Sequence, residues 1–269
     1  MRHNVNINDI SLAYESTGTG PFLMLIHGFT GSSSTMSHLC EALAPYRTVL
    51  SVDLIGHGKS DSPQQIDHYT IESNIAHLQG ILQHAGAKKA DLVGYSLGGR
   101  IALSFANAFS NTVESLFLIG TSPGINSNEA LVRKISDSNL ALLIESDGLE
   151  VFVDQWMQLP IWKSLQERIG PAKWKESREQ RLANTSAGLA NSLRGSGVAS
   201  MPPLHNFLHL ITNPVHLIAG EEDPKFSQLA EQMNQLFPNG QVHIVPNAGH
   251  AAHLEQPKFV SDLIIKALK

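Results

Sequence analysis

Short, mainly apolar runs recur along the chain, of which residues 22–26 are wholly apolar, and longer segments with apolar residues at helical spacing separate them. Such runs predict strands that are buried on both faces, as the strands of a parallel sheet are. They occupy residues 22–26, 48–52, 91–94, 113–119, 215–219 and 241–245. Residues 5–16 instead alternate apolar and polar positions around Asn8-Asp9, a pattern that predicts an N-terminal hairpin.

Apolar residues at helical spacing predict helices between or after these strands. The expected helices cover residues 34–43, 70–86, 97–109, 225–237 and 256–268. The repeated order of strand then helix predicts an α/β fold, with a mostly parallel central sheet and helices on both of its faces.

The middle of the chain breaks this order. Residues 122–210 contain helical patterns and all three tryptophans, but no convincing strand. We therefore expect residues 1–121 and 211–269 to form one core, with residues 122–210 inserted into it as a helical lid.

Composition and charge narrow the function. Apolar residues make up 42% and charged residues 16% of the 269 residues, which supplies a core and gives no signature of disorder. The net charge of −5, without a basic stripe, argues against a nucleic-acid-binding protein. Charges balance within residues 125–205, whereas the rest of the chain is acidic. The predicted lid is therefore relatively basic, which suits an anionic ligand.

The expected location follows from features that the sequence lacks. The chain has one cysteine, Cys40, which excludes an internal disulfide. Residues 1–4 do not lead into the apolar run of a signal peptide, and the run at 22–26 is too short to span a bilayer. We therefore expect a cytoplasmic protein that does not insert into a membrane.

A Gly-x-Ser-x-Gly pattern, Gly94-Tyr95-Ser96-Leu97-Gly98, lies between a predicted strand and a predicted helix. In this context the pattern is typical of a nucleophile elbow, in which small neighbours allow the sharp turn at the central serine. Ser96 would then stand at the N-terminus of a helix, where free amides and the helix dipole favour negative charge. We predict that Ser96 is catalytic, rather than an ordinary serine in a glycine-rich turn.

The acidic partner of Ser96 is expected in the loop after the strand at 215–219. Glu221, Glu222 and Asp223 lie there, at the carboxyl end of the sheet, where ligand chemistry is expected in α/β folds. We favour Asp223 because it lies furthest along the loop. The alternative is that all three acids are solvated loop charges.

The catalytic base is expected after the last predicted strand. His250 follows both that strand and the acid, which is the chain order of a triad on this kind of sheet. His253, three residues further on, is its competitor.

Backbone amides near Ser96 are predicted to stabilise negative charge on the substrate. One donor is the amide of Leu97, and the second is expected from Phe29, in the loop after the first buried strand. His27 is expected to hold that loop by hydrogen bonds rather than to act as a catalyst.

Together these motifs resemble the α/β-hydrolase fold over nearly the whole chain. The likeness rests on His27-Gly28, Asp53-x-x-Gly56-His57-Gly58-x-Ser60, the elbow, the acid and Gly249-His250. One departure is Ile55, where the family usually has proline in a loop that is chiefly structural.

Further motifs resemble a narrower family, the 2-succinyl-6-hydroxy-2,4-cyclohexadiene-1-carboxylate synthases of menaquinone biosynthesis. They are the segment 93–100, Gly220-Glu221-x-Asp223-x-Lys225-Phe226, Leu193-Arg194-Gly195-x-Gly197, Gln155-Trp156-x-x-x-Pro160-Ile161-Trp162 and Ser122-Pro123-Gly124. The resemblance implies a lyase that eliminates pyruvate from 2-succinyl-5-enolpyruvyl-6-hydroxy-3-cyclohexene-1-carboxylate. It also implies that Ser96, assisted by His250 and Asp223, removes a proton from carbon.

Arg100 lies one helical turn after Ser96. A cation at this position suits an anionic substrate better than an apolar ester, because a guanidinium binds carboxylates in a bidentate manner. The alternative is an ion pair with Asp53 or Asp61.

The resemblance also implies substrate-binding residues in and beside the lid. Arg133 and Arg181 match family arginines that hold substrate carboxylates. Their competitors are the other lid cations Lys134, Arg178 and Arg194. Tyr95 is expected to donate its hydroxyl to the substrate and Trp156 to stack over the substrate ring, the alternative for both being ordinary packing.

Two other functions stay open on the sequence. A serine carboxylesterase or a carbon–carbon bond hydrolase would use the same triad with Ser96 as nucleophile. A non-catalytic binding module is disfavoured because it has no need of a complete triad.

The expected partner is a small-molecule polycarboxylate, with no nucleic acid, and the expected assembly is a monomer or homodimer. His205 and His209 lack the H-E-x-x-H motif and no nucleotide-binding loop occurs, so we expect neither metal nor cofactor.

Overall fold

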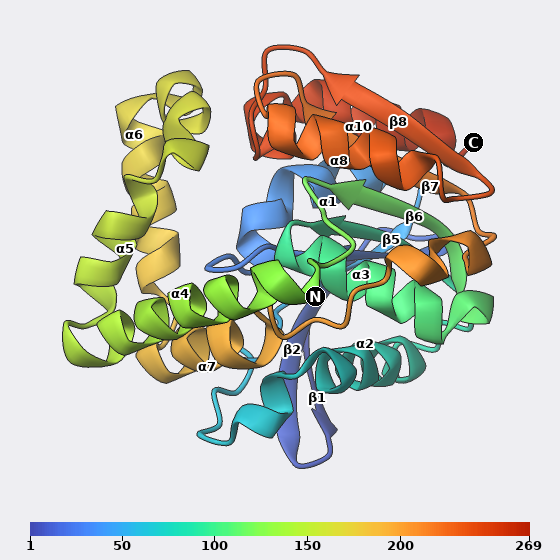
Figure 1. The fold of residues 1–269 in the computed structure, drawn as a ribbon. Coiled ribbons are helices and arrows are strands. Elements are labelled where there is room, and N and C mark those ends of the chain that lie inside the picture. The colour runs from blue at the N-terminus through green and yellow to red at the C-terminus, as the bar shows by residue number, and fades with distance from the viewer.

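A single sheet of eight strands, in the order β1-β2-β4-β3-β5-β6-β7-β8, runs through the protein (Figure 1). The computed structural model describes residues 1–269, apart from the side chain of Ser127. The strands are β1 (Arg2–Ile7), β2 (Ile10–Thr17), β3 (Phe22–Ile26), β4 (Thr48–Val52), β5 (Ala90–Tyr95), β6 (Val113–Ile119), β7 (Val215–Gly220) and β8 (Gly240–Val245).

Strand pairing matches the predicted α/β fold. β1 and β2 form an antiparallel hairpin, β2 is antiparallel to β4, and all other neighbours are parallel. The hairpin turns at Asn8 and Asp9, whose φ angles of 52° and 64° lie in the left-handed region that these two residue types tolerate. Every residue of β5 and β7 is buried, which explains why both strands are mainly apolar in sequence.

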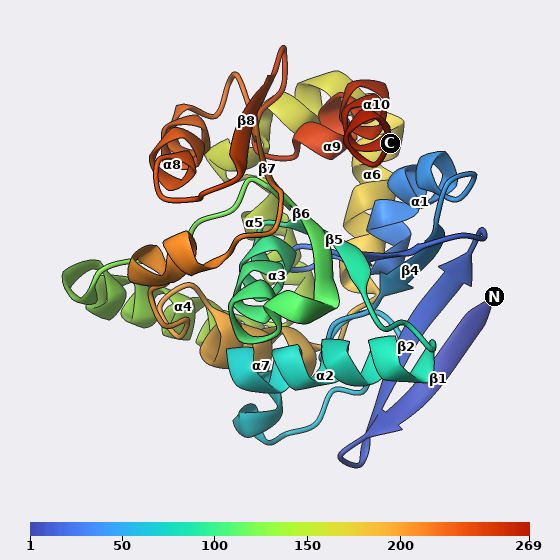
Figure 2. The ribbon, with the colours of Figure 1, turned by 90° about the vertical axis from the view of Figure 1, so that its right-hand side faces the viewer.

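Helices cover both faces of the sheet. The helices of the core are α1 (Ser37–Leu43), α2 (Ile71–His84), α3 (Leu97–Ala108), α8 (Pro224–Asn234), α9 (Ala252–Glu255) and α10 (Pro257–Ala267). One apolar cluster joins α2, α3 and α8 to the sheet, and a second joins α1 and α10 to its other face (Figure 2). The predicted helix ends were accurate to within three residues. The segment predicted from residue 34 begins as a 3₁₀ turn (Ser33–Met36), and α1 starts three residues later than expected.

Four further helices lie between β6 and β7 in the chain and stand to one side of the sheet (Figure 1). They are α4 (Ser127–Ser146), α5 (Leu149–Met157), α6 (Lys163–Leu182) and α7 (Ser186–Ser196). Gly170, with φ of 73°, kinks α6 immediately before Pro171. The remaining 3₁₀ turns are Ile66–Tyr69, Ser110–Thr112, Pro160–Trp162 and His205–Leu210.

The helices α4, α5 and α7 share a small apolar core, against which Trp174 and Leu182 of α6 pack. Its buried members are Ala141, Ile144, Phe152, Val153, Met157, Leu189, Ala190 and Leu193. Among the described residues, no helix is both long and apolar enough to cross a bilayer.

Candidate active site

Ser96 lies at the sharp turn from β5 into α3, with φ of 50° and ψ of −107°. The turn requires close backbone packing at its glycines. A Cβ atom on Gly94 would lie 2.5 Å from the carbonyl oxygen of Gly98, and one on Gly98 would lie 2.2 Å from that of Ile26. The two glycines of the motif therefore permit the backbone that presents Ser96 at the carboxyl edge of the sheet.

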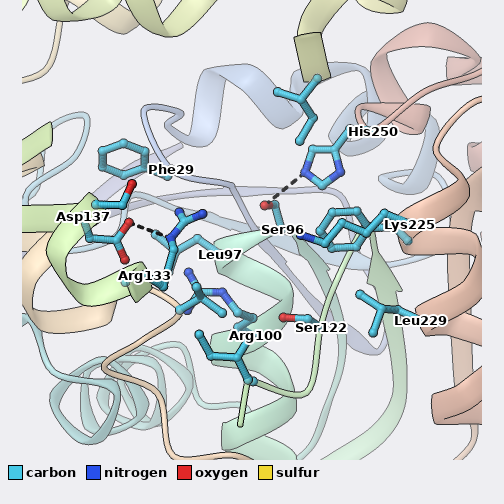
Figure 3. Close-up of a pocket in the computed structure, with 18 of the residues that line it drawn as sticks. Phe29, Ser96, Leu97, Arg100, Ser122, Arg133, Asp137, Lys225, Leu229 and His250 are labelled. Carbon is cyan, nitrogen blue, oxygen red and sulfur yellow. Dashed lines mark hydrogen bonds and ion pairs between the residues drawn. The ribbon is translucent and has the colours of Figure 1, made fainter. Parts of the chain in front are cut away.

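His250 connects Ser96 to Asp223, and Figure 3 shows its contact with Ser96. Its Nε2 atom lies 3.3 Å from Ser96 Oγ, and its Nδ1 atom lies 3.0 Å from Asp223 Oδ2. A carboxylate can only accept a hydrogen bond, so Nδ1 carries the proton and Nε2 is free to accept from the serine hydroxyl. This is the geometry of a serine, base and acid relay.

The acidic loop gives each of its three carboxylates a different partner. Glu221 accepts from the backbone N–H of Asn247 at 3.1 Å, and Glu222 forms an ion pair with Arg168. Asp223 alone reaches the histidine, and its other oxygen accepts from the N–H of Phe226 at the start of α8. The structure thus brings Asp223, and neither glutamate, to the site.

Glu255 holds the loop that carries His250, a contact that the sequence analysis did not anticipate. Its fully buried side chain accepts from the N–H of Gly249 at 3.0 Å and from Arg168 at 2.7 Å. Arg168 lies on α6 and also pairs with Glu222. One arginine from outside the core therefore ties together the loops of the acid and the base.

His253 lies away from the serine. It is 1% exposed, and its ring packs 4.3 Å from that of Tyr95 and 5.6 Å from that of His38. Burial holds the pKa of His253 well below its usual value, and the neighbouring His38 and His250 lower this pKa further. Its position is that of a neutral packing residue.

The loop after β3 is positioned by His27, which is fully buried. His27 Nδ1 lies 2.8 Å from the carbonyl oxygen of Gly28, and Nε2 accepts from the N–H of Leu54 at 3.0 Å. Burial lowers the pKa of His27 to about 4, so the imidazole is neutral at pH 7. This matches the structural role expected for it.

Phe29 and Leu97 both line the cavity in front of Ser96. Leu97 is the first residue of α3, where backbone amides have no partner within the helix. Within the described part of the chain, neither amide donates to an acceptor. Both N–H groups are thus available to an oxygen atom bound near Ser96.

The cavity has a volume of about 1350 Å³. It is lined by residues of α3 and α8 and by residues of the inserted helices α4, α5 and α7. Three cationic side chains reach it: Arg100 from α3, Arg133 from α4 and Lys225 from α8 (Figure 3). Only two carboxylates, Glu129 and Asp137, line it among the described residues. The site therefore combines a serine triad with an excess of positive charge.

Arg100 is a half-buried residue in the wall of the cavity and makes no ion pair with Asp53 or Asp61. Its Nη1 atom donates to the carbonyl oxygen of Ser196 at 2.9 Å. Burial, and then the charge of Arg133, lower the pKa of Arg100 to about 10, so it stays charged at pH 7. Its guanidinium consequently lacks a direct carboxylate partner within the described structure.

Arg133 pairs with Asp137 one helical turn later, through Nε and Oδ1 at 2.8 Å. The second oxygen of Asp137 is buried and has no partner among the described residues. Burial raises the pKa of Asp137, while the charges of Arg133 and Arg100 oppose this shift. Sequence reasoning missed Asp137, for which the spacing of four residues from Arg133 was the available signal.

Lys225 was missed as a ligand candidate as well. It follows the acid by two residues, and Pro224 at the start of α8 turns the chain so that Lys225 reaches the cavity. Its ammonium lies 5.6 Å from the ring centroid of Phe226.

Arg181 does not line this cavity. It lies on a second, smaller cavity of about 250 Å³, which shares Phe29, Tyr95 and Trp162 with the first. Arg178 pairs with Asp154 and Glu150, Arg194 pairs with Glu145, and Lys134 lines neither cavity. The predicted role of Arg181 towards the substrate stays a prediction.

The two predicted aromatic ligands, Trp156 and Tyr95, line the larger cavity. Trp156 packs edge-on against Phe29, with ring centroids 5.3 Å apart. The indole N–H of Trp156 and the hydroxyl of Tyr95 are buried and without a partner in the described residues. Burial raises the pKa of Tyr95, so its hydroxyl remains a donor.

The sequence is similar to a known protein family and to individual enzymes within it. A family model described as alpha/beta hydrolase fold matches residues 21–257. A putative 2-succinyl-6-hydroxy-2,4-cyclohexadiene-1-carboxylate synthase of Bacillus subtilis is 35% identical over 98% of this chain and 97% of its own length. The synthase of an Enterobacter species is 31% identical over 93% of this chain and 92% of its own length.

Solved structures agree with these relatives. The structure of MenH from S. aureus superposes with a TM-score of 0.89 at 32% identity, covering 95% of this chain and 97% of that one. A thermophilic esterase from Thermogutta terrifontis superposes with a TM-score of 0.88 at 26% identity, covering 100% of this chain and 98% of that one. The chain therefore belongs to the α/β-hydrolase-fold family and, within it, to the family of 2-succinyl-6-hydroxy-2,4-cyclohexadiene-1-carboxylate synthases.

Proposed function

We propose that this protein is a lyase that eliminates pyruvate from 2-succinyl-5-enolpyruvyl-6-hydroxy-3-cyclohexene-1-carboxylate. The product is 2-succinyl-6-hydroxy-2,4-cyclohexadiene-1-carboxylate, an intermediate of menaquinone biosynthesis. The observation that carries the proposal is the single cavity in which Ser96 and His250 face Arg100, Arg133 and Lys225. A substrate with three carboxylates matches three cations in one site.

The proton relay supplies the base. His250, oriented by Asp223, takes the proton of the Ser96 hydroxyl, and the resulting alkoxide removes a proton from a substrate carbon. The electron pair left on carbon expels the enolpyruvyl oxygen, and the carbon–oxygen bond breaks. Protonation of the released enolate gives pyruvate. Ser96 acts as a base throughout and forms no covalent bond to the substrate.

The backbone amides of Phe29 and Leu97 stabilise the charge that develops on the substrate. Deprotonation next to a carbonyl group moves negative charge onto oxygen, and two free N–H groups beside Ser96 are placed to receive it. The amides are held by the backbone, so they need no reorganisation during the reaction.

The cations hold the substrate in register with Ser96. Arg100 is fixed from one side by the carbonyl oxygen of Ser196, and Arg133 is fixed by Asp137. Tyr95 and Trp156 line the same cavity, and the hydroxyl of Tyr95 and the indole N–H of Trp156 have no partner within the described residues. Fixing a reactant in one orientation lowers the entropic part of the barrier.

We propose that residues 122–210 act as a lid over a core formed by residues 1–121 and 211–269. This division is supported by the separate apolar core of α4, α5 and α7, and by Arg133, which reaches the cavity from α4. The reaction proposed here needs a small-molecule substrate only. A cytoplasmic location and a monomeric or homodimeric state belong to the same proposal.

The test is pyruvate release by the purified protein from the succinyl-enolpyruvyl substrate, with a short-chain nitrophenyl ester assayed in parallel. Fast pyruvate release with negligible ester cleavage is the expected result. Efficient ester cleavage without pyruvate would instead identify a serine hydrolase. Trapping of a stable acyl-enzyme on Ser96 during turnover would exclude the base-only mechanism.

A further inference from the structure

The first half of α6 packs against the loop that carries the catalytic base. α6 lies beside α9, which follows that loop in the chain (Figure 2). A Cβ atom on Gly249 would lie 2.1 Å from Ser164 Oγ, so no side chain fits between this backbone and α6. Leu165 is fully buried in the same apolar cluster as Ala248 and Ala251. This part of an inserted helix is therefore anchored on the core.

Three donors hold the buried carboxylate of Glu255, and two of them come from α6. Oε2 accepts from the N–H of Gly249, the residue before His250, at 3.0 Å and from Arg168 Nη1 at 2.7 Å. Ser164 Oγ donates to Oε1 at 3.2 Å. The Glu255 side chain is 0% exposed, and Arg168 is its one charged partner among the described residues. Leaving a buried charge unpaired is strongly unfavourable, so this carboxylate depends on Arg168 for its position.

Arg168 reaches the acid loop as well. Its Nη2 atom donates to Glu222, the residue before Asp223. One guanidinium thus contacts both loops, because Glu255 holds the residue before His250. The strand ends of the core bring these loops to the same edge of the sheet, and the guanidinium fixes the spacing between them. Arg168 lines neither cavity, so it acts without touching the substrate.

We propose that Arg168 is a positioning residue that keeps the proton relay in register. It acts on the acid loop through Glu222 and on the base loop through Glu255. A guanidinium suits this role because its planar array of donors binds two carboxylates at fixed angles, whereas an ammonium is a point charge. The inserted helix α6 then contributes to catalysis itself, in addition to standing beside the cavity.

Turnover kinetics test the inference, and this test alone rests on the proposed release of pyruvate. Arg168→Met should lower kcat roughly 50-fold, because a displacement of about 1 Å in a reacting group costs about 100-fold. KM should stay within about twofold, because the contacts to the substrate are unchanged. Arg168→Lys keeps the charge but loses the planar donors, and its kcat should fall roughly tenfold. Each assay is run well below the Tm of the variant.

Arg178→Met is the matched control. Arg178 lies on the same helix, pairs with the carboxylates of Asp154 and Glu150, and lines neither cavity. Neither carboxylate belongs to a relay loop, so kcat should stay within about twofold. An equal loss of kcat in Arg168→Met and Arg178→Met would overturn the inference, because it would reveal a general effect of loosening α6.

A double variant removes the buried charge instead of leaving it unpaired. In Arg168→Met/Glu255→Gln, the glutamine can still accept from the N–H of Gly249 and donate to Ser164 Oγ. Its kcat should exceed that of Arg168→Met roughly fivefold, because no unpaired carboxylate displaces the base loop. Absence of this recovery would overturn the route through Glu255. If Arg168→Met does not fold, Arg168→Lys is compared with the natural protein instead.

Proton nuclear magnetic resonance reads the relay without any substrate. The Nδ1–H of His250, bonded to Asp223, should give a far-downfield signal that is lost in Asp223→Asn. Arg168→Met should shift or broaden this signal, whereas Arg178→Met should leave it in place. If the natural protein releases no pyruvate, the proposed function fails, but this signal still decides the inference. An unchanged signal in Arg168→Met would overturn it.

Discussion

The core and the inserted helices differ in how they position their charged side chains. In the core, Asp223 contacts His250 from an adjacent strand end, and Asp53 accepts from two backbone N–H groups. In the inserted helices, the arginines that reach a cavity come from separate helices, Arg133 from α4 and Arg181 from α6. The comparison teaches that backbone geometry in the core places the proton relay, whereas the inserted helices add Arg133 to the two cations, Arg100 and Lys225, that α3 and α8 place in the same cavity.

Ser96→Ala removes the hydroxyl of the proton relay in the core and should have the largest effect on turnover. Without the hydroxyl, His250 has no base to activate, and turnover should fall by roughly 10⁴-fold or more. The measurement is pyruvate release at saturating substrate. Ser104→Ala, on the same helix but outside the cavity, is the matched control and should retain activity. Substantial turnover by Ser96→Ala would contradict the relay.

Arg100→Met should cost about 100-fold in kcat/KM for pyruvate release, through the loss of a charge-assisted bond to a substrate carboxylate. Cleavage of a neutral nitrophenyl ester, if any is present, should change little. An equal loss for both substrates would mean that Arg100 supports the elbow rather than the anion.

Lowering the pH should reduce the free energy of unfolding, because the core contains buried neutral histidines. Burial lowers the pKa of His27 to about 4 and that of His57 to about 3, so both are neutral in the folded protein but take up a proton below about 6.5 when unfolded. Their contribution is therefore complete above pH 6.5 and is lost as the pH falls towards 4. At about pH 5 each should already cost about 2 kcal/mol of unfolding free energy.

Urea unfolding at about pH 7 and about pH 5 measures this loss. The only histidines within residues 122–210 are His205 and His209, whereas the other eleven, His27 and His57 among them, lie in the rest of the chain. Equal stability at the two pH values would show that the core histidines are not buried as neutral groups.

Asp137→Asn tests how the inserted helices contribute to substrate binding, and its expected effect is smaller than that of Arg100→Met. Arg133 loses its charged partner, so the KM for the substrate should rise about tenfold while kcat stays nearly unchanged. Asp154→Asn, which alters an exposed lid carboxylate paired with Arg178, is the control. A fall in kcat at constant KM would instead place Asp137 in the chemical step.

Arg178→Met should have the smallest effect of the series. Arg178 pairs with the exposed side chains of Asp154 and Glu150 and lines neither cavity. Activity should stay within about twofold, as expected for a surface ion pair. A large loss would mean that lid cations outside the cavities also steer the substrate.

The sequence by itself determined the core of this protein. The apolar runs placed the strands, and Gly94-x-Ser96-x-Gly98 marked the elbow, because its backbone can form only with glycines at those positions. Strand ends in a parallel sheet meet at one edge, so the order of serine, acid and histidine along the chain was enough to predict that they converge.

Only the tertiary structure decided which of several similar residues occupy the sites. Glu221, Glu222 and Asp223 are adjacent in sequence, yet each has a different partner. A shift of one position along a loop changes the direction of the side chain. Within residues 122–210, helical spacing does not show which arginines face a cavity, because that depends on how the helices pack. Arg133 reaches the catalytic cavity, whereas Arg178 pairs with two exposed acids. Arg181 lines a second cavity and has no counter-ion there among the described residues.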